Sequence, residues 1–411
     1  MEPTPAGRRF AVVVLTAMNL LNYVDRYVPS SVKLLFQRDL GLNDAQTSLP
    51  LTAFVVVYML ASPVFGTLAD RFPRRALIAA GVALWSLATG GAALATGFWS
   101  LLAARALVGV GEAAYATIAP SLISDLYPPE RRNRILTIFY VAIPVGAALG
   151  FGLGGLIGGA AGWRAAFLAC GLPGLVVAAM AFAIRDPGRG AFDKGPAARA
   201  IGWPEATRLL ARNRQYVIAV AGYTAVTFAA GGMADWLAAY LGRHRDMDVA
   251  EAGSLVGIVT VCGGLGGTAV GGWLADRLRD RTRQPYLATS ALSMLLATVF
   301  AVLTFTVSGK ASIAVCLFFA QFFLWFYNGP INAIIANSVS SNLVARAFAL
   351  SILAIHLLGD AISPPIIGAI SDATGSLALA VSIVPVTMLV GALVWAWGWR
   401  RLPEEPSAVS H

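Results

Sequence analysis

Charge is scarce in this sequence. Asp, Glu, Lys and Arg make up 12% of the 411 residues, about half of what a soluble domain usually carries. Hydrophobic residues make up 57%, the mean hydropathy is +0.71, and the apolar residues fall in repeated runs of about 20, long enough to cross a bilayer. In hydrocarbon each segment must satisfy its own backbone hydrogen bonds, so we expect an all-α membrane protein and exclude a soluble globular one.

The signatures of enzymes and pumps are also absent. The three cysteines stand alone in separate predicted spans, without the spacing of a disulfide or a metal site. There is no metal-ligand cluster, no nucleophile–base arrangement and no phosphate-binding Gly-x-x-x-x-Gly-Lys-Ser/Thr loop. We therefore expect no enzyme, no metal and no cofactor, and a process driven by an ion gradient or by the solute's own gradient.

The net charge of +9 reflects membrane topology rather than nucleic-acid binding. In the predicted spans, 22 of the 30 basic residues fall on one side, six fall on the other, and Arg26 and Arg105 lie inside spans. This bias is the positive-inside pattern, and it predicts that both termini are cytoplasmic. The short loops, the lack of Asn-x-Ser/Thr sequons and the low lysine content favour a bacterial inner membrane.

The predicted spans number twelve and divide into two groups of six. A connector at 185–214, with several glycines and scattered charge, separates an N-terminal half at 1–184 from a C-terminal half at 215–411. We expect the protein to be a monomer in the lipid bilayer. The spans are placed at 10–32, 47–69, 76–97, 100–124, 135–158, 163–184, 215–241, 250–275, 285–307, 311–337, 346–371 and 376–399.

A motif repeats at the end of the second span of each half. In each copy a glycine precedes an Asp-Arg pair by four residues, as in GTLADR, which starts at Gly66, and GWLADR, which starts at Gly272. The glycine is expected to allow close helix approach, and the charges to hold the loop at the cytoplasmic face. We interpret the motif as a conformational latch made of Gly66, Asp70, Arg71, Arg74, Arg75, Asp276 and Arg277.

Ionisable residues lie deep in two spans of the first half. Asp25 and Arg26 fall well past the middle of span 1, and Arg105 and Glu112 share one face of span 4. Charges at such depth are costly and indicate function. A carboxylate that alternates between apolar surroundings and a nearby arginine would load and release a proton. We predict that Asp25 and Glu112 couple protons, with Arg26 and Arg105 as their electrostatic partners; a structural ion pair is the alternative.

Amide and aromatic residues in the second half indicate where a cargo binds. Gln321, Trp325, Asn328 and Asn332 recur on one helical face, which lines a cavity or forms a hydrogen-bond ladder between helices. The predicted cargo site also includes Thr224 and Phe228 of span 7, and Asn19, Tyr23, Arg26 and Phe151 of the first half. By contrast, Asp235 is expected near water at the outer end of span 7, and His356 as a hydrogen-bonded packing residue.

These segments resemble a known family. GTLADRFPRR at 66–75 resembles the signature loop of the major facilitator superfamily, with Pro73 in place of the usual second glycine. NYVDRY at 22–27, the segment 109–134 and the Pro-Gly pattern at 139–155 resemble the Spinster group of these transporters. The resemblance implies the major facilitator fold, alternating access and a lysolipid- or sphingolipid-like cargo. A transporter of small organic anions or drugs, with proton symport or antiport, remains the alternative, and the repeated latch argues against a receptor or channel.

Overall fold

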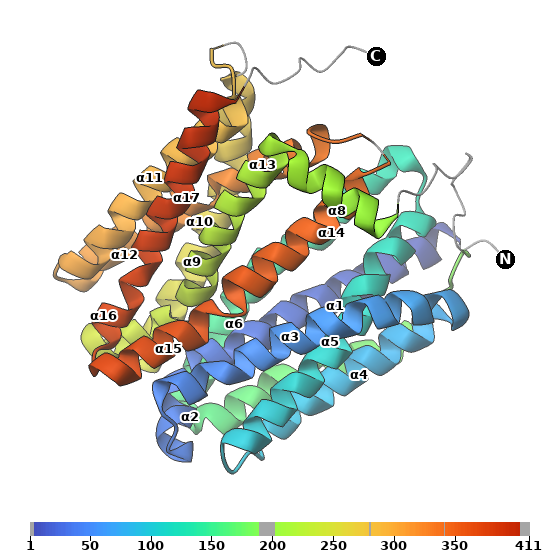
Figure 1. Cartoon of the computed structure of the whole chain (residues 1–411). Coiled ribbons are helices and arrows are strands. Elements are labelled where there is room, and N and C mark those ends of the chain that lie inside the picture. The colour runs from blue at the N-terminus through green and yellow to red at the C-terminus, as the bar shows by residue number, and fades with distance from the viewer. Residues whose placement is uncertain (1–3, 189–201, 279–280, 341, 403–411) are drawn as a thin grey trace. The chain divides into compact units, whose positions relative to one another are not determined.

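The computed structural model describes residues 4–188, 202–278, 281–340 and 342–402, and every regular element in these ranges is a helix (Figure 1). A 3₁₀ turn at Trp325–Tyr327 and a π-helical turn at His356–Asp360 join some of the α-helices. The α-helices are α1 (Pro5–Ser31), α2 (Lys33–Leu40), α3 (Asp44–Arg71), α4 (Arg74–Ala92), α5 (Phe98–Leu126), α6 (Pro129–Gly171), α7 (Gly174–Ala181), α8 (Trp203–Arg212), α9 (Arg214–His244), α10 (Val249–Arg277), α11 (Pro285–Thr306), α12 (Lys310–Leu324), α13 (Asn328–Asn337), α14 (Val344–Ile355), α15 (Ser363–Thr374), α16 (Leu377–Val381) and α17 (Ile383–Arg401).

The described helices account for the twelve predicted spans. Ten segments are long and apolar enough to cross a membrane. One of them, Glu130–Ala181, has 52 residues, roughly 78 Å of helix rise against a hydrocarbon core of about 30 Å. It breaks at Gly162, whose φ of 84° suits glycine, and so contains two spans. Helix α1 is less apolar because it carries Asp25, Arg26 and two asparagines, and it is the twelfth.

Contacts between helices divide the chain into two compact units, described separately below. Unit 1 comprises Met1–Gly195, Ala234–Ile258 and Pro364–Gly375, and unit 2 comprises Pro196–Met233, Val259–Ser363 and Ser376–His411. Helices α9 and α10 therefore contribute to both units. The sequential division into halves at 1–184 and 215–411 stays a prediction.

Glycines allow the closest helix contacts of unit 1. Helix α6 lies against α1, and Cβ atoms on Gly146 and Gly150 would stand 2.5 and 2.6 Å from backbone carbonyl oxygens of α1. A Cβ on Gly109 of α5 would likewise stand 2.5 Å from the carbonyl oxygen of Phe54 on α3. Glycine is therefore required where these backbones touch, and these contacts place the charged face of α5 directly beside α1 and α3.

In unit 2, α11 packs against α12 and α17, drawn in orange and red in Figure 1. The fully buried Trp395 of α17 donates from its indole nitrogen to the carbonyl of Ala219 on α9 at 3.2 Å. Gly222 on α9 faces the same indole ring, with room for no larger residue. An aromatic anchor and small residues thus join α9 to α17.

One feature was not anticipated in the sequence. The predicted connector at 185–214 contains α8, whose Ala206 and Leu210 are buried one turn apart; residues 189–201 of that connector lie outside the described ranges. The span predicted at 311–337 is present as a helical segment at Lys310–Asn337, within which a 3₁₀ turn at Trp325–Tyr327 joins α12 to α13.

Candidate functional site

Arg26 lies at the centre of a polar cluster inside unit 1. Its Nη2 donates to Oε2 of Glu112 on α5 at 2.7 Å. The same guanidinium lies 4.8, 4.9 and 5.6 Å from the ring centroids of Tyr23, Phe54 and Tyr58. The Glu112 side chain is completely buried, whereas that of Arg26 is 20% exposed. Arg26 and Glu112 thus form a charge-assisted hydrogen bond in largely aromatic surroundings, and the Arg26 guanidinium is the more exposed member of the pair.

Asp25, the next residue along α1, faces different groups. It has no exposed surface, and within the described residues no well-aligned hydrogen bond reaches its carboxylate oxygens. Glu112 and Arg105 lie within electrostatic reach, and the indole N–H of Trp85 is a nearby donor. Successive helical side chains diverge by about 100°, which explains why Asp25 does not join the hydrogen bond between Arg26 and Glu112. An ionised carboxylate with so few partners is costly in such surroundings.

Arg105 completes the cluster from α5. It is 1% exposed, and its guanidinium carbon lies 5.2 Å from the ring centroid of Phe54. Within the described residues, neither of its terminal nitrogens donates a hydrogen bond, and Oε1 of Glu112 accepts none. All four ionisable residues predicted to couple protons therefore lie together. Buried polar groups are normally satisfied, so this cluster has unused capacity to bind a proton or an anion.

Two of the predicted cargo residues in unit 1 serve helix packing in this conformation. The side-chain amide of Asn19 donates to the carbonyl of Phe139 on α6 at 2.9 Å. Phe151 is 1% exposed, and its ring lies 5.0 Å from that of Tyr27. Both contacts hold α1 against α6, which leaves Tyr23 and Arg26 as the more accessible predicted residues here. The role of all four in cargo binding stays a prediction.

In unit 2, the predicted face of span 10 is locally hydrogen-bonded. The indole of Trp325 donates to Oε1 of Gln321 at 3.2 Å, and the amide of Asn332 donates to the carbonyl of Asn328 at 2.6 Å. Both bonds join residues one turn apart on the same segment. Among the described residues, these hydrogen bonds therefore run along span 10. They do not form a hydrogen-bond ladder between helices, which was one of the two roles predicted for this face.

The predicted residues of α9 pack beside the π-helical turn. Phe228 is 8% exposed, the hydroxyl of Thr224 donates to the carbonyl of Val220 at 2.9 Å, and a Cβ on Gly359 would stand 3.2 Å from the Phe228 nitrogen. In the same turn, Nδ1 of His356 lies 2.9 Å from both carboxylate oxygens of Asp360. His356 is thus hydrogen-bonded, as the sequence predicted.

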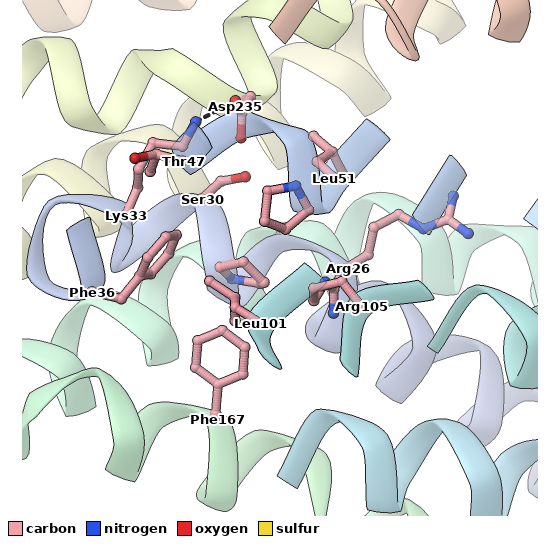
Figure 2. A pocket seen from close by; sticks show the side chains of 12 residues that line it. Arg26, Ser30, Lys33, Phe36, Thr47, Leu51, Leu101, Arg105, Phe167 and Asp235 are labelled. Atoms are coloured by element: carbon pink, nitrogen blue, oxygen red, sulfur yellow. Dashed lines mark hydrogen bonds and ion pairs between the residues drawn. The ribbon is translucent and has the colours of Figure 1, made fainter. Parts of the chain in front are cut away.

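A buried ion pair lies beyond the Arg26 cluster in unit 1. The ammonium of Lys33 points to the carboxylate of Asp235 (Figure 2), and Ser48 bonds to both groups, at 2.8 Å from Lys33 Nζ and 2.7 Å from Asp235 Oδ2. Lys33 Nζ also lies 3.8 Å from the ring centroid of Trp236. The expectation that Asp235 lies at the water-exposed end of span 7 is wrong, because Asp235 is 3% exposed and Lys33 is 1% exposed.

A small cavity connects this ion pair to the cluster. Its lining includes Lys33 and Asp235 at one end and Arg26 and Arg105 at the other (Figure 2). Its volume of about 10 Å³ is close to the least that holds one water molecule. In this conformation the space therefore admits water or a proton but no cargo.

A second ion pair lies nearby in unit 1. Asp44, at the start of α3, accepts hydrogen bonds from Arg243 at 2.6 and 2.8 Å and from Ser371 at 2.6 Å. Asp372 in turn accepts from the backbone nitrogens of Asp44 and Ala45, each at 2.9 Å. A carboxylate at a helix N-terminus is stabilised by the unpaired N–H groups, so Asp372 fixes α15 to the first turn of α3.

Among the residues predicted to form the latch, Arg74 is buried within unit 1. Its guanidinium donates to Asp125 at 2.5 Å, to Asp186 at 2.8 Å and to Ser121 at 3.3 Å. A polar groove of about 400 Å³ lies beside it, lined by residues that include Gly66, Asp70, Arg74, Ser121, Asp125 and Arg132. In this conformation Arg74 joins α4 to α5 and to the segment that follows α7, and Arg75 donates to the carbonyl of Phe182 at 3.4 Å.

The close helix approach expected at the motif glycines is not present in this conformation. A Cβ on Gly66 would meet only ordinary contact with Thr117 at 3.8 Å, and one on Gly272 would meet nothing within 4 Å. In unit 2, Asp276 accepts from the Tyr286 hydroxyl at 3.4 Å, and Arg277 lies 5.5 Å from the Trp273 ring centroid. The latch role of both copies stays a prediction.

Comparison with known proteins finds a matching family and similar sequences. Residues 15–359 match the Major Facilitator Superfamily. The chain is 36% identical to protein spinster homolog 1 of Homo sapiens over 390 residues, which cover 90% of this chain and 74% of that protein. It is 34% identical to the sphingosine-1-phosphate transporter SPNS2 of Danio rerio over 382 residues, 88% of this chain and 76% of that protein.

A solved structure has a similar fold. The crystal structure of a bacterial homolog to the human lysosomal transporter Spinster, in an inward-facing and unoccupied conformation, superposes with a TM-score of 0.84. The two chains are 23% identical, and the match covers 97% of this chain and 96% of the other. The resemblance to Spinster transporters that the sequence motifs indicated is confirmed.

Proposed function

Because the chain belongs to the Spinster family of the major facilitator superfamily, and is a multi-pass membrane transporter rather than an enzyme, we propose that it carries a lysolipid- or sphingolipid-like amphiphile by alternating access coupled to protons. The cargo class rests on two points. One relative is a sphingosine-1-phosphate transporter. Here, the accessible guanidinium of Arg26 beside aromatic rings suits an anionic headgroup next to an apolar body.

Proton coupling is supported chiefly by the burial of the Asp25 carboxyl group. It is completely buried and lies within electrostatic reach of Glu112 and Arg105. An ionised carboxylate is costly in such surroundings. When Glu112 parts from Arg26, either carboxylate can take up a proton, and renewed pairing expels it. Asp25 and Glu112 thereby carry the coupled proton, and Arg26 links its release to cargo binding.

We further propose a topology and a location for the transporter. The two six-helix halves rock about the central site, the Gly-x-x-x-Asp-Arg motifs hold one end closed, and both termini are cytoplasmic. A monomer in a bacterial inner membrane fits the arginine bias, the short loops and the absence of sequons.

A transporter of small organic anions or drugs is the second candidate. The NYVDRY segment of α1 resembles that of organic-anion/proton symporters of the same superfamily. The same Arg26 guanidinium would bind a carboxylate as readily as a phosphate. The two candidates differ in whether an acyl chain is required for binding.

Transport by purified protein in proteoliposomes separates the two candidates. We expect labelled lysophospholipid or sphingosine-1-phosphate to cross in a saturable manner, faster under an imposed pH gradient. Small organic anions of the same charge should neither cross nor compete, because they lack the apolar body. Saturable transport of the small anions with no competition from either lipid would establish the second candidate instead.

A further inference from the structure

A groove on the surface of unit 2 lies apart from the candidate transport site. It has a volume of about 560 Å³ and runs between α11 and α17, within the size range of ligand sites. On α17 six of its seven lining residues recur at positions 392, 393, 396, 397, 400 and 401, which is one stripe of a helix, and Trp399 borders that stripe. The groove therefore follows a seam between two helices rather than a local indentation.

Small residues form the floor of this groove. Ala291 of α11 and Ala392 of α17 are 3% and 2% exposed, and Ala396 lies one turn beyond Ala392. Large apolar side chains stand on either side, with Leu393 and Trp397 58% and 56% exposed. Because alanine side chains are short, they leave a space above them. The longer side chains of Leu393 and Trp397 border this space and do not fill it. The resulting hollow is elongated and apolar, as an acyl chain requires.

One end of the groove carries positive charge. Arg400 and Arg401 belong to its lining, are exposed, and have no ion-pair partner among the described residues. The indole of Trp399 donates to the Thr282 hydroxyl at 2.8 Å, which fixes the segment that also contains Arg281 and Arg283. No carboxylate belongs to the described lining. An apolar groove thus ends among arginines and tryptophans.

We propose that this groove binds an anionic diacyl phospholipid of the surrounding bilayer. Arg400 and Arg401 bind the headgroup phosphate, Trp397 lies at the level of the interface, and an acyl chain lies over the alanine floor. Basic pockets between transmembrane helices commonly bind acidic headgroups. A free phosphate lacks the chain that the apolar groove requires. The proposal is independent of the cargo, since no residue of the groove belongs to the candidate transport site.

Lipid binding to the purified full-length protein in detergent tests this proposal. Phosphatidylglycerol and phosphatidylcholine with identical acyl chains are titrated separately, and bound lipid is counted by native mass spectrometry. We expect one saturable phosphatidylglycerol site with at least about tenfold preference over phosphatidylcholine, because the choline cation of phosphatidylcholine offsets its phosphate charge and is repelled by the two adjacent arginines. The double variant Arg400→Gln/Arg401→Gln should lose that preference, and Ala396→Phe should weaken the site by filling its floor.

The matched control is the double variant Arg131→Gln/Arg134→Gln. It removes the same charge from exposed positions on α6 of unit 1 and should bind phosphatidylglycerol like wild type. Thermal unfolding without added lipid verifies that each variant is folded. The proposal is overturned if phosphatidylcholine binds as tightly, if Arg400→Gln/Arg401→Gln binds like wild type, or if both double variants lose binding equally.

Discussion

Proteoliposomes containing the Glu112→Gln variant should carry lysolipid at a rate that no longer responds to a pH gradient. Glutamine cannot exchange a proton, and it replaces the charge-assisted bond to Arg26 at 2.7 Å with a weaker neutral one. Under an imposed pH gradient, Glu112→Gln should therefore transport lysolipid about tenfold or more slowly than wild type, because a hydrogen bond to a charged group is worth roughly 1.5–3 kcal/mol. Initial rates of labelled lysolipid uptake, measured over a series of internal and external pH values, provide the measurement.

Asp25→Asn should abolish the same pH response without destabilising the protein. The substitution replaces a completely buried carboxyl group by a neutral amide of similar size, so the unfolding temperature should be equal to or above that of wild type. Asp39→Asn is the control, since Asp39 pairs with Arg164 at an exposed position on α2. If Glu112→Gln and Asp25→Asn both keep the wild-type pH dependence, these two carboxylates do not couple the proton.

The Lys33→Met variant should be strongly destabilised. It leaves the carboxylate of Asp235 buried and without its cation, and removal of one member of a buried ion pair costs about 3–5 kcal/mol. The double variant Lys33→Met/Asp235→Leu should regain most of this stability, because it removes both charges and keeps apolar volume beside Trp236. Unfolding in detergent, followed by tryptophan fluorescence, compares the variants.

The exposed pair of Asp39 and Arg164 serves as the reference for this experiment. Hydrogen bonds from Arg164 and Trp163 lower the pKa of Asp39, but both members of the pair are 46% exposed. Surface pairs of this kind contribute little to stability, so Arg164→Gln should unfold close to wild type. Equal stability of Lys33→Met and Arg164→Gln would show that the Lys33–Asp235 pair does not hold α2, α3 and α9 together.

The sequence predicted the membrane fold well because bilayer physics is local. Each span must be apolar over about 20 residues, and this is visible without knowledge of the partners. Gly146 and Gly150, which belong to the Pro-Gly pattern at 139–155, lie where α6 meets the backbone of α1. The sequence did not reveal local changes of helix type inside a span, such as the 3₁₀ turn at Trp325–Tyr327.

The predicted charged site was found because charge at mid-membrane depth is rare. Asp25, Arg26, Arg105 and Glu112 stood out by type and depth alone. The sequence did not reveal the ion pair of Lys33 and Asp235. The two residues lie 202 positions apart and near the ends of spans, so no local pattern indicated that they pair. Arg74 was predicted as a charge of the latch loop, and its buried ion pairs with Asp125 and Asp186 were not predicted, because these partners are brought to it by the fold. Pairing at long range is a property of packing, which sequence periodicity does not reveal.

Proton movement caused by the cargo tests the central claim most directly. Lysolipid is added to proteoliposomes that enclose a pH-sensitive dye, with no pH gradient imposed. The account predicts a rapid internal pH change in wild type that is absent from Glu112→Gln and Asp25→Asn liposomes of equal protein content. Labelled lysolipid that crosses in wild type without any change in internal pH would contradict proton-coupled transport through this site.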